Sequence, residues 1–184
     1  MGDPKQPRKK YHGPTMVWEK ERIEEEKKIL KEYGIKNKKE IWKLSSSLKR
    51  FKDLAKKSIA AEGVQADKEK KQLIDRLVRL GLVKPNASLD DILGLTLKDI
   101  LERRLQTIVV RLGLARSARQ ARQFITHQHI IVGDRKITSP SYIVSKEEEL
   151  KVTFVSSSAL SDPEHPEREK GPKKEEEKKD AGNK

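Results

Sequence analysis

Arginine is concentrated in one stretch of this 184-residue chain, between residues 103 and 136. The stretch contains seven arginines, one lysine and a single acidic residue, Asp134, whereas lysine outnumbers arginine 28 to 6 elsewhere. A guanidinium group is planar and weakly hydrated, so it can bind phosphate through two hydrogen bonds and stack on bases. The local preference for arginine therefore indicates a phosphate-binding surface. A solvated helix face that happens to use arginine is the alternative interpretation.

Ser117 is expected to cap a helix inside this stretch. Serine is a favourable N-cap residue, and Gln120 stands three residues later, where a capping box has its second partner. The free N–H groups and partial positive charge of a helix N-terminus attract anions. Three arginines, Arg116, Arg119 and Arg122, lie close in sequence to the helix N-terminus at Ser117. The combination predicts that the helix N-terminus binds phosphate.

Two helices and a small strand lobe are expected to position these side chains. Apolar residues at helical spacing predict one helix over 97–112, stopped by Gly113, and a second that begins at Ser117. Isoleucine and valine then become frequent between turn signals. This pattern predicts three short strands, over about 130–132, 135–137 or 142–144, and 150–155.

Residues 15–100 are expected to form a helical N-terminal region. Helices are predicted over 17–33, 38–44, 47–62 and 67–80, followed by a one-turn helix that begins at Ser88 and ends at Gly94. Thr96 then opens the helix over 97–112 with a second capping box. The first is so polar that it needs another surface to pack on. The third has an apolar face and a basic face, the latter with Lys49, Arg50, Lys52, Lys56 and Lys57. This basic face predicts bulk attraction for a polyanion.

The two ends of the chain have their own composition. Residues 1–14 contain three prolines, two glycines and a basic cluster, which predicts an extended basic arm. RNA contact and an ordinary disordered terminus are equally compatible with that arm. Residues 159–184 are expected to be a disordered charged tail, because the segment is low in complexity and almost without apolar residues. Since its charge is nearly balanced, we expect RNA affinity not to depend on residues 162–184.

Several classes of protein are excluded by what the chain lacks. It has no cysteine, so disulfides and thiolate chemistry are absent. His127 and His129 have no third ligand at metal spacing, and no glycine-rich phosphate loop or nucleophile elbow occurs. No apolar run approaches the length of a membrane span, and the charged N-terminus lacks the apolar stretch of a secretory signal. With a net charge of +13, the chain is expected to be a soluble intracellular non-enzyme without cofactors, whose partners are polyanions.

The segment from Glu102 to Val144 closely resembles an RNA-binding module named after ribosomal protein S-four. The resemblance extends to the strings GDPK near the start, ERIEEEKKILKEYGIKNKKEIW at 21–42 and LDDILGL at 89–95. Together these are similar to the archaeal or eukaryotic branch of the small-subunit S-four family, over about residues 2–158. The resemblance implies an α+β fold: a helical N-terminal part, then a module of two antiparallel helices packed on a small strand lobe over 101–158.

The resemblance also implies which residues contact ribosomal RNA. The expected set comprises Arg103, Arg104, Arg111, Arg116, Ser117, Arg119, Gln120, Arg122, Gln123, His127, His129 and Lys136, joined by Lys9, Lys10 and Tyr11 of the arm. Two positions depart from the family pattern. Gln128 stands where the family commonly has glycine, which predicts a reshaped turn, and Gly133-Asp134 replaces the usual Asn-Gly pair. The cysteine-rich zinc site of some bacterial relatives has no counterpart, so zinc is not expected.

The function implied by the resemblance is that of a structural constituent of the small ribosomal subunit. Such a protein binds 16S-type rRNA in the cytoplasm, nucleates assembly of the subunit body and influences translational accuracy. Its expected neighbours include the S-five family protein and mRNA where it enters the subunit. Two alternatives place the module elsewhere: appended to an RNA-modifying enzyme, or standing alone in a stress-related RNA-binding protein. Only about 100 residues precede the module, which is short for a catalytic domain.

Overall fold

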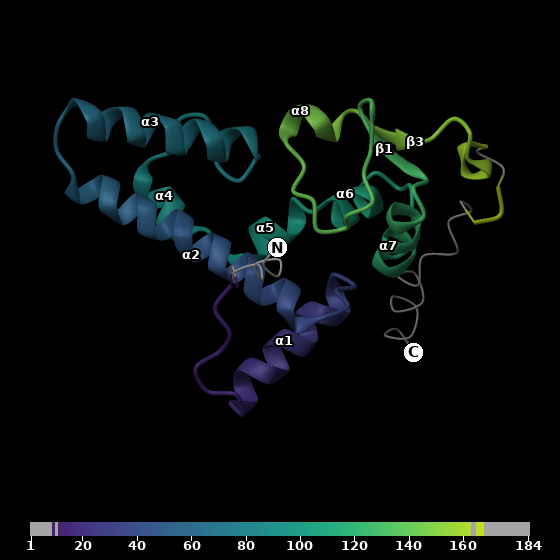
Figure 1. The fold of residues 1–184 in the computed structure, drawn as a ribbon, viewed down its shortest axis with the longest axis horizontal. Coiled ribbons are helices and arrows are strands. Elements are labelled where there is room, and N and C mark those ends of the chain that lie inside the picture. The colour runs from purple at the N-terminus through teal and green to yellow at the C-terminus, as the bar shows by residue number, and fades with distance from the viewer. Residues whose placement is uncertain (1–8, 10, 163–164, 168–184) are drawn as a thin grey trace, which may run out of the picture.

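A long helix, α2 (Lys38–Ala60), forms the axis of the N-terminal half (Figure 1). The computed structural model describes residues 9, 11–162 and 165–167. Helix α2 contacts the other helices of this half, which are α1 (Lys20–Glu32), α3 (Val64–Arg79), α4 (Leu89–Gly94) and α5 (Leu97–Glu102). The helical N-terminal region is therefore built around one central helix.

Helix α2 replaces the two separate helices expected over 38–44 and 47–62, so that prediction of a break was wrong. No glycine or proline interrupts the serine run at 45–47. Ser46 is buried, and its hydroxyl donates to the carbonyl of Trp42 one turn earlier at 2.7 Å. Because that bond satisfies the hydroxyl inside the helix, the serines do not end it.

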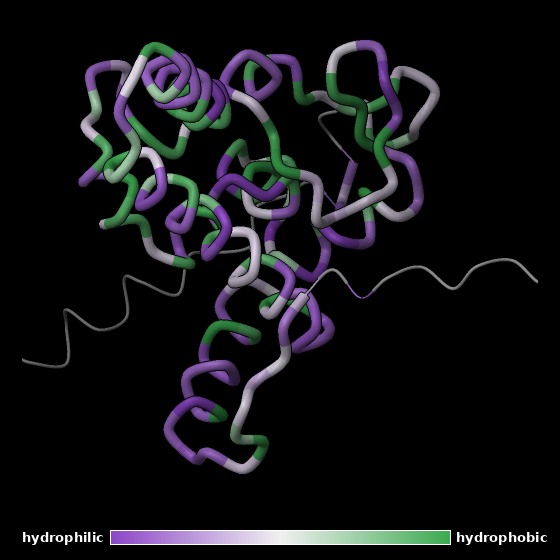
Figure 2. The backbone as a smooth tube through the Cα atoms, turned by 60° about the vertical axis from the view of Figure 1, so that its left-hand side comes forward, coloured by the Kyte–Doolittle hydropathy of each residue, from purple (hydrophilic) through white to green (hydrophobic). Residues whose placement is uncertain are grey.

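Helix α1 is the polar projection of the molecule, coloured mainly as hydrophilic in Figure 2. Its single buried residue is Glu26. Burial would raise the pKa of this carboxyl, but hydrogen bonds from Trp42, Lys38 and Arg22 outweigh it and hold the pKa below its usual range. Polar bonds from Trp42 and Lys38 thus join the packing of Ile29 and Leu30 against the core in attaching α1 to α2.

The C-terminal half combines short helices with a three-stranded antiparallel sheet. Its elements are α6 (Leu105–Arg111), α7 (Ala118–Thr126), β1 (Ile130–Val132), β2 (Arg135–Lys136), α8 (Lys146–Glu149), β3 (Val152–Phe154) and the 3₁₀ turn η1 (Ala159–Ser161). The sheet order is β2-β1-β3, and Ile131 of β1 pairs with Lys136 and Thr153. This arrangement confirms the α+β class and the strand lobe.

The helix expected over 97–112 is divided into α5 and α6, which corrects that prediction. Arg104 adopts an extended conformation at the division, with ψ of 142°. Backbone bonds from Val144 to Arg103 and from Leu105 to Tyr142 join the division to the segment 142–144. That segment was one of two candidates for the second strand, and it forms an isolated bridge here, whereas 135–136 forms β2. Long-range backbone pairing overrides helix propensity at this point.

The ordered fold continues past residue 158. Leu160 in η1 is 6% exposed and belongs to the same apolar core as Phe124 and Ile130. Residues 159–162 are thus part of the folded protein, although the expected tail began at 159. The remainder of the expected tail, apart from 165–167, and most of the expected arm lie outside the described residues.

Candidate nucleic-acid interface

Helix α7 carries the residues expected to bind phosphate. Its apolar side, with Ala121, Phe124 and Ile125, is buried in the C-terminal core. Ser117 caps the helix as predicted, because its hydroxyl accepts from the N–H of Gln120 at 3.3 Å. The side chain of Gln120 does not return to the N-cap backbone, and its Oε1 accepts from the N–H of Arg116 at 2.7 Å instead. The cap therefore includes the residue before the serine.

The outward side of α7 and its N-cap present four residues of the expected set to solvent. Arg116, Ser117, Arg119 and Gln123 are all exposed. The side chain of Arg119 makes no hydrogen bond or ion pair within the part of the chain that the structure describes. Its guanidinium group is therefore available for a ligand. Together with the capped N-terminus, these side chains form what we call the α7 face: residues 116, 117, 119, 120 and 123.

Arg122 faces the N-terminal region. Its Nη2 lies 2.8 Å from Oε1 of Glu40 on α2, and its side chain is 24% exposed. Glu40 binds a second guanidinium group, because its Oε2 accepts from Nη2 of Arg104 at 2.6 Å. Burial would raise the pKa of Glu40, but the hydrogen bonds from Arg122 and Arg104 lower it below the usual range. Glu40 is thus an anionic bridge between α2 and the C-terminal half.

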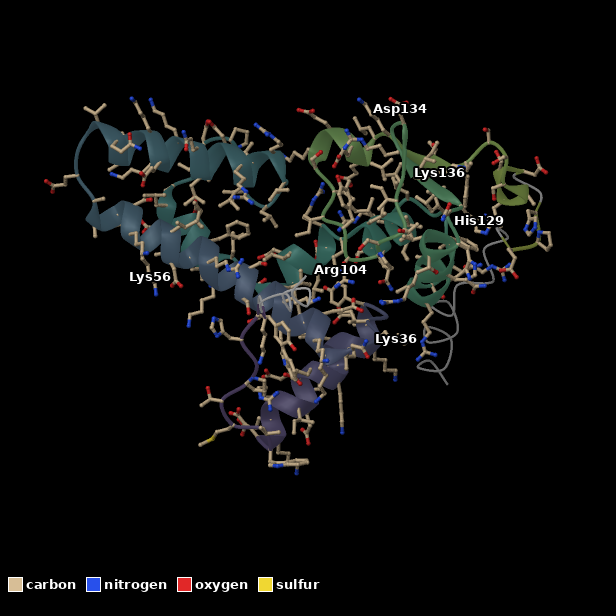
Figure 3. The ribbon with its side chains drawn as sticks, viewed as in Figure 1. Lys36, Lys56, Arg104, His129, Asp134 and Lys136 are labelled. Carbon is tan, nitrogen blue, oxygen red and sulfur yellow. The ribbon has the colours of Figure 1, made fainter. Side chains whose placement is uncertain are left out.

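Arg103 and Arg104 were expected to contact RNA, and the structure places both inside the protein. Arg104 is 1% exposed and lies in the middle of the molecule, near α2 (Figure 3). Arg103 is 8% exposed, and it pairs with Glu149 at 2.6 Å and donates to the carbonyl of Val144 at 3.1 Å. Their guanidinium groups hold the two halves and the strand lobe together, and they do not belong to the α7 face.

A buried amide attaches the N-terminal region to the start of α7. Gln106 is 1% exposed, and its Nε2 donates to the carbonyls of Tyr33, Gly34 and Ala118. Gly34 has a positive φ of 59°, and a Cβ added there would lie 2.7 Å from the Cβ of Ala118. The loop between α1 and α2 can therefore sit directly on the N-terminal turn of α7.

Sequence reasoning missed Gln106 and Glu40, the two residues that link the N-terminal region to the C-terminal half. Gln106 offered a signal, since it is an amide among the apolar residues 105, 108 and 109 that fill the core. Glu40 offered none, because it is one of many glutamates on charged helices. Its role depends on two arginines that lie 64 and 82 positions away.

The two expected histidines lie beside α7, where the chain turns into β1. His127 is exposed, while Nδ1 of His129 is 2.8 Å from the hydroxyl of Ser158. Both line a cavity of about 360 Å³ together with Phe124, His165 and others. No cluster of metal-ligating side chains occurs among the described residues. Gln128 takes the left-handed conformation, with φ of 63°, which is the conformation that glycine adopts without strain.

The remaining expected residues are dispersed. Arg111 is about half exposed and lies 3.4 Å from Glu102. Lys136 is exposed at the end of β2, in the hairpin that also contains Asp134 (Figure 3).

The described part of the N-terminal arm lies against α2. The ring of Tyr11 stacks on Trp42 at 6.3 Å between centroids, and Lys9 Nζ lies 4.9 Å from the Tyr11 ring centre. The backbone N–H of His12 donates to Ser46 at 3.0 Å. Tyr11 is therefore engaged with protein, while Lys10 lies outside the described residues.

A second basic surface runs along α2. Lys49, Lys56 and Lys57 are exposed on it, and Lys56 lies on the side away from α3 (Figure 3). It adds positive charge to the surface of the N-terminal region, as the sequence predicted. Among the described residues, no helix has the length and apolar character needed to cross a bilayer.

Comparison with known proteins gives the relationship of the whole chain. The S4 domain family matches residues 103–150. The small ribosomal subunit protein uS4 of Ignicoccus hospitalis is 48% identical over 158 residues, which cover 86% of this chain and 95% of the relative. The uS4 protein of Nanoarchaeum equitans is 47% identical over 163 residues, covering 88% of this chain and 91% of the relative. The expected family is thereby confirmed: the chain belongs to the uS4 family of small ribosomal subunit proteins.

Proposed function

We propose that this protein is a structural component of the small ribosomal subunit and binds its 16S-type rRNA directly. The observation that carries the proposal is the α7 face: a capped helix N-terminus with exposed Arg116 and Arg119, in a chain that matches uS4 proteins over most of its length. The donors on this face fit phosphate oxygens.

Electrostatic attraction supplies most of the affinity in this proposal. Phosphate neutralisation by lysine and arginine releases counterions, which makes binding strongly dependent on salt. The exposed lysines of α2 provide long-range attraction, and the α7 face provides contact with the RNA backbone. A-form RNA hides its major groove, so selectivity arises from the shape of a folded RNA and from its 2′-hydroxyl groups.

Arg103 and Arg104 have a positioning role in the proposed mechanism. Their ion pairs with Glu149 and Glu40 fix α5, α6 and α8 relative to one another and to α2. Arg122 shares Glu40 with Arg104, so its guanidinium group orients α7 and presents only its exposed edge to RNA. The direct contacts are assigned to Arg116, Ser117, Arg119, Gln120 and Gln123.

The finer parts of the proposal rest on the family resemblance. They are nucleation of subunit assembly, an influence on translational accuracy, a location in the cytoplasm, and positions beside the S-five family protein and incoming mRNA. The alternative of a module appended to an enzyme does not fit the comparisons, because 95% of a uS4 chain aligns with this one. That full-length match also disfavours a standalone stress-related protein.

Replacing Arg119 tests the proposed contact. Arg119→Ala should weaken binding to a small-subunit rRNA transcript by about 1–3 kcal/mol, or about 5- to 150-fold, and reduce the salt slope by about one unit. Arg79→Ala on α3, which also removes an exposed arginine, is the matched control and should have a smaller effect. Equal effects of the two substitutions in a filter-binding titration would show that α7 contributes only bulk charge.

A further inference from the structure

A short C-terminal segment of this chain occupies the α7 face. Residues 165–167 follow η1 and lie against the N-terminus of α7. The guanidinium group of Arg116 donates to the carbonyls of Pro166 and Glu167, the latter at 3.2 Å. Gln120 Nε2 donates to both the carbonyl of Glu167, at 3.0 Å, and its carboxylate, at 2.8 Å.

The groups in contact are those that an RNA phosphate would use. A carboxylate and two carbonyls place anionic or polar oxygens against an arginine and an amide beside a helix N-terminus. The orientation of Gln120 favours such oxygens, because its Oε1 accepts from the N–H of Arg116 and leaves Nε2 directed at the ligand. One set of donors therefore serves either the chain's own carboxylate or a phosphate.

The segment is held close to α7 by the core. Leu160 is buried in the core that contains Phe124, and Ser158 contacts His129 at 2.8 Å. Glu167 is only seven positions from Leu160, so the tether keeps its local concentration high. A turn orients the segment further, because the N–H of Glu167 donates to Nδ1 of His165 at 3.2 Å.

We propose that residues 165–167 compete with RNA for the α7 face, which replaces the expectation from composition that RNA affinity does not depend on residues 162–184. In the free protein, Pro166 and Glu167 cover Arg116 and Gln120; on the ribosomal RNA, backbone phosphates replace them. The inference rests on the proposed function, since it concerns the same surface. Docking of the segment lowers the apparent affinity for RNA, because the association constant is multiplied by the fraction of molecules whose α7 face is free. It also screens these donors from other anions before the correct RNA arrives.

Removing the charge of Glu167 tests the competition in the full-length chain. Glu167→Gln should tighten binding to a small-subunit rRNA transcript by about two- to fivefold, because it weakens the exposed hydrogen bond that the carboxylate accepts from Gln120. Glu167→Lys should tighten it by more, because it removes that acceptor and places a like charge beside Arg116. Glu147→Gln and Glu147→Lys on α8 are matched controls that alter net charge equally at an exposed position. The change in affinity caused by each Glu147 variant measures the effect of net charge alone, and it is subtracted from the change caused by the corresponding Glu167 variant.

A second measurement detects docking without RNA. The ¹H and ¹⁵N resonances of the Gln120 side-chain amide, which donates to the Glu167 carboxylate at 2.8 Å, should shift between the wild type and Glu167→Lys, and should not shift in Glu147→Lys. Unchanged resonances would show that the segment does not dock in solution. That result overturns the inference and leaves the proposed function in place.

Affinity and docking together separate the outcomes. Shifted resonances, with tightening beyond that of the Glu147 variants, support the competition. Shifted resonances without extra tightening, while Arg119→Ala still weakens binding, show that the segment docks but does not compete, which overturns the inference alone. If Arg119→Ala binds as tightly as the wild type, the α7 face is not the RNA site. The proposed function and the competition then fail together.

Discussion

Replacement of Glu40 by glutamine should destabilise the protein, because one carboxylate holds two guanidinium groups. The distances are 2.6 Å to Arg104 and 2.8 Å to Arg122. The side chain of Arg104 is only 2% exposed, so water cannot replace the lost partner. Glu40→Gln leaves that guanidinium group buried without a counter-charge, and it also removes the bridge between α2 and α7.

The size of the effect follows from the burial of the two pairs. Breaking a buried ion pair by removing one partner costs about 3–5 kcal/mol, whereas a partly exposed pair contributes at most about 1 kcal/mol. Glutamine retains one acceptor oxygen and recovers about 1 kcal/mol as a hydrogen bond. We therefore expect the free energy of unfolding to fall by about 3 kcal/mol. For a chain of this length that lowers Tm by about 6–12 °C.

Urea unfolding followed by circular dichroism measures this loss, with Glu102→Gln as the matched control. Glu102 pairs with Arg111 at 3.4 Å, and both side chains are about half exposed, so the control should lose less than about 1 kcal/mol. A double-mutant cycle of Glu40→Gln and Arg122→Ala then isolates the part of the loss that passes through α7.

The pH dependence provides a further check on Glu40. Because its pKa is lower in the folded protein than the ordinary value of 4.5, its contribution is fully present above about pH 4.5. It is lost as pH falls further, through the lowered pKa of the folded state. The stability difference between wild type and Glu40→Gln should thus be constant near neutral pH and shrink in acid. An equal loss in Glu102→Gln, or a difference that persists in strong acid, would refute the bridging role.

Two further substitutions test the packing that supports the α7 face. Gly34→Ala should cost about 2–4 kcal/mol, because it combines a positive φ with a Cβ placed 2.7 Å from Ala118; Gly94→Ala, with open space around it, should be close to neutral in the same urea titration. Leu160→Ala should cost about 2–3 kcal/mol, since the residue is buried in the main C-terminal core; a Tm equal to that of the wild type would place residue 160 in the tail after all.

Local signals predicted the elements whose stability is local. The capping boxes at Ser88 and Thr96 and the cap at Ser117 could be predicted from the sequence, because each needs only residues within four positions of one another. The strand at 130–132 could be predicted from its isoleucines and valine. Helix α8 was missed: its capping box at Ser145 and Glu148 was present in the sequence, but the segment was interpreted as part of a strand lobe.

Long-range contacts determined what the sequence did not reveal. The division between α5 and α6 depends on backbone pairing with residues 142–144, about 40 positions away. The same holds for Arg103 and Arg104, whose charge suggested a surface role while their partners Glu149 and Glu40 lie far along the chain. Near-neutral composition likewise concealed the contact of Glu167 with α7, because composition reports average charge and not position.

Directed cleavage of rRNA from α7 tests the central claim most directly. The chain has no cysteine, so Gln123→Cys provides a unique attachment point for an iron chelate on the exposed side of α7. After assembly of this variant with small-subunit rRNA, hydroxyl radicals generated at position 123 should cut the RNA backbone at a few localised nucleotides. Cleavage no greater than that from the unmodified, cysteine-free chain would contradict the assignment of the α7 face as the RNA-binding surface.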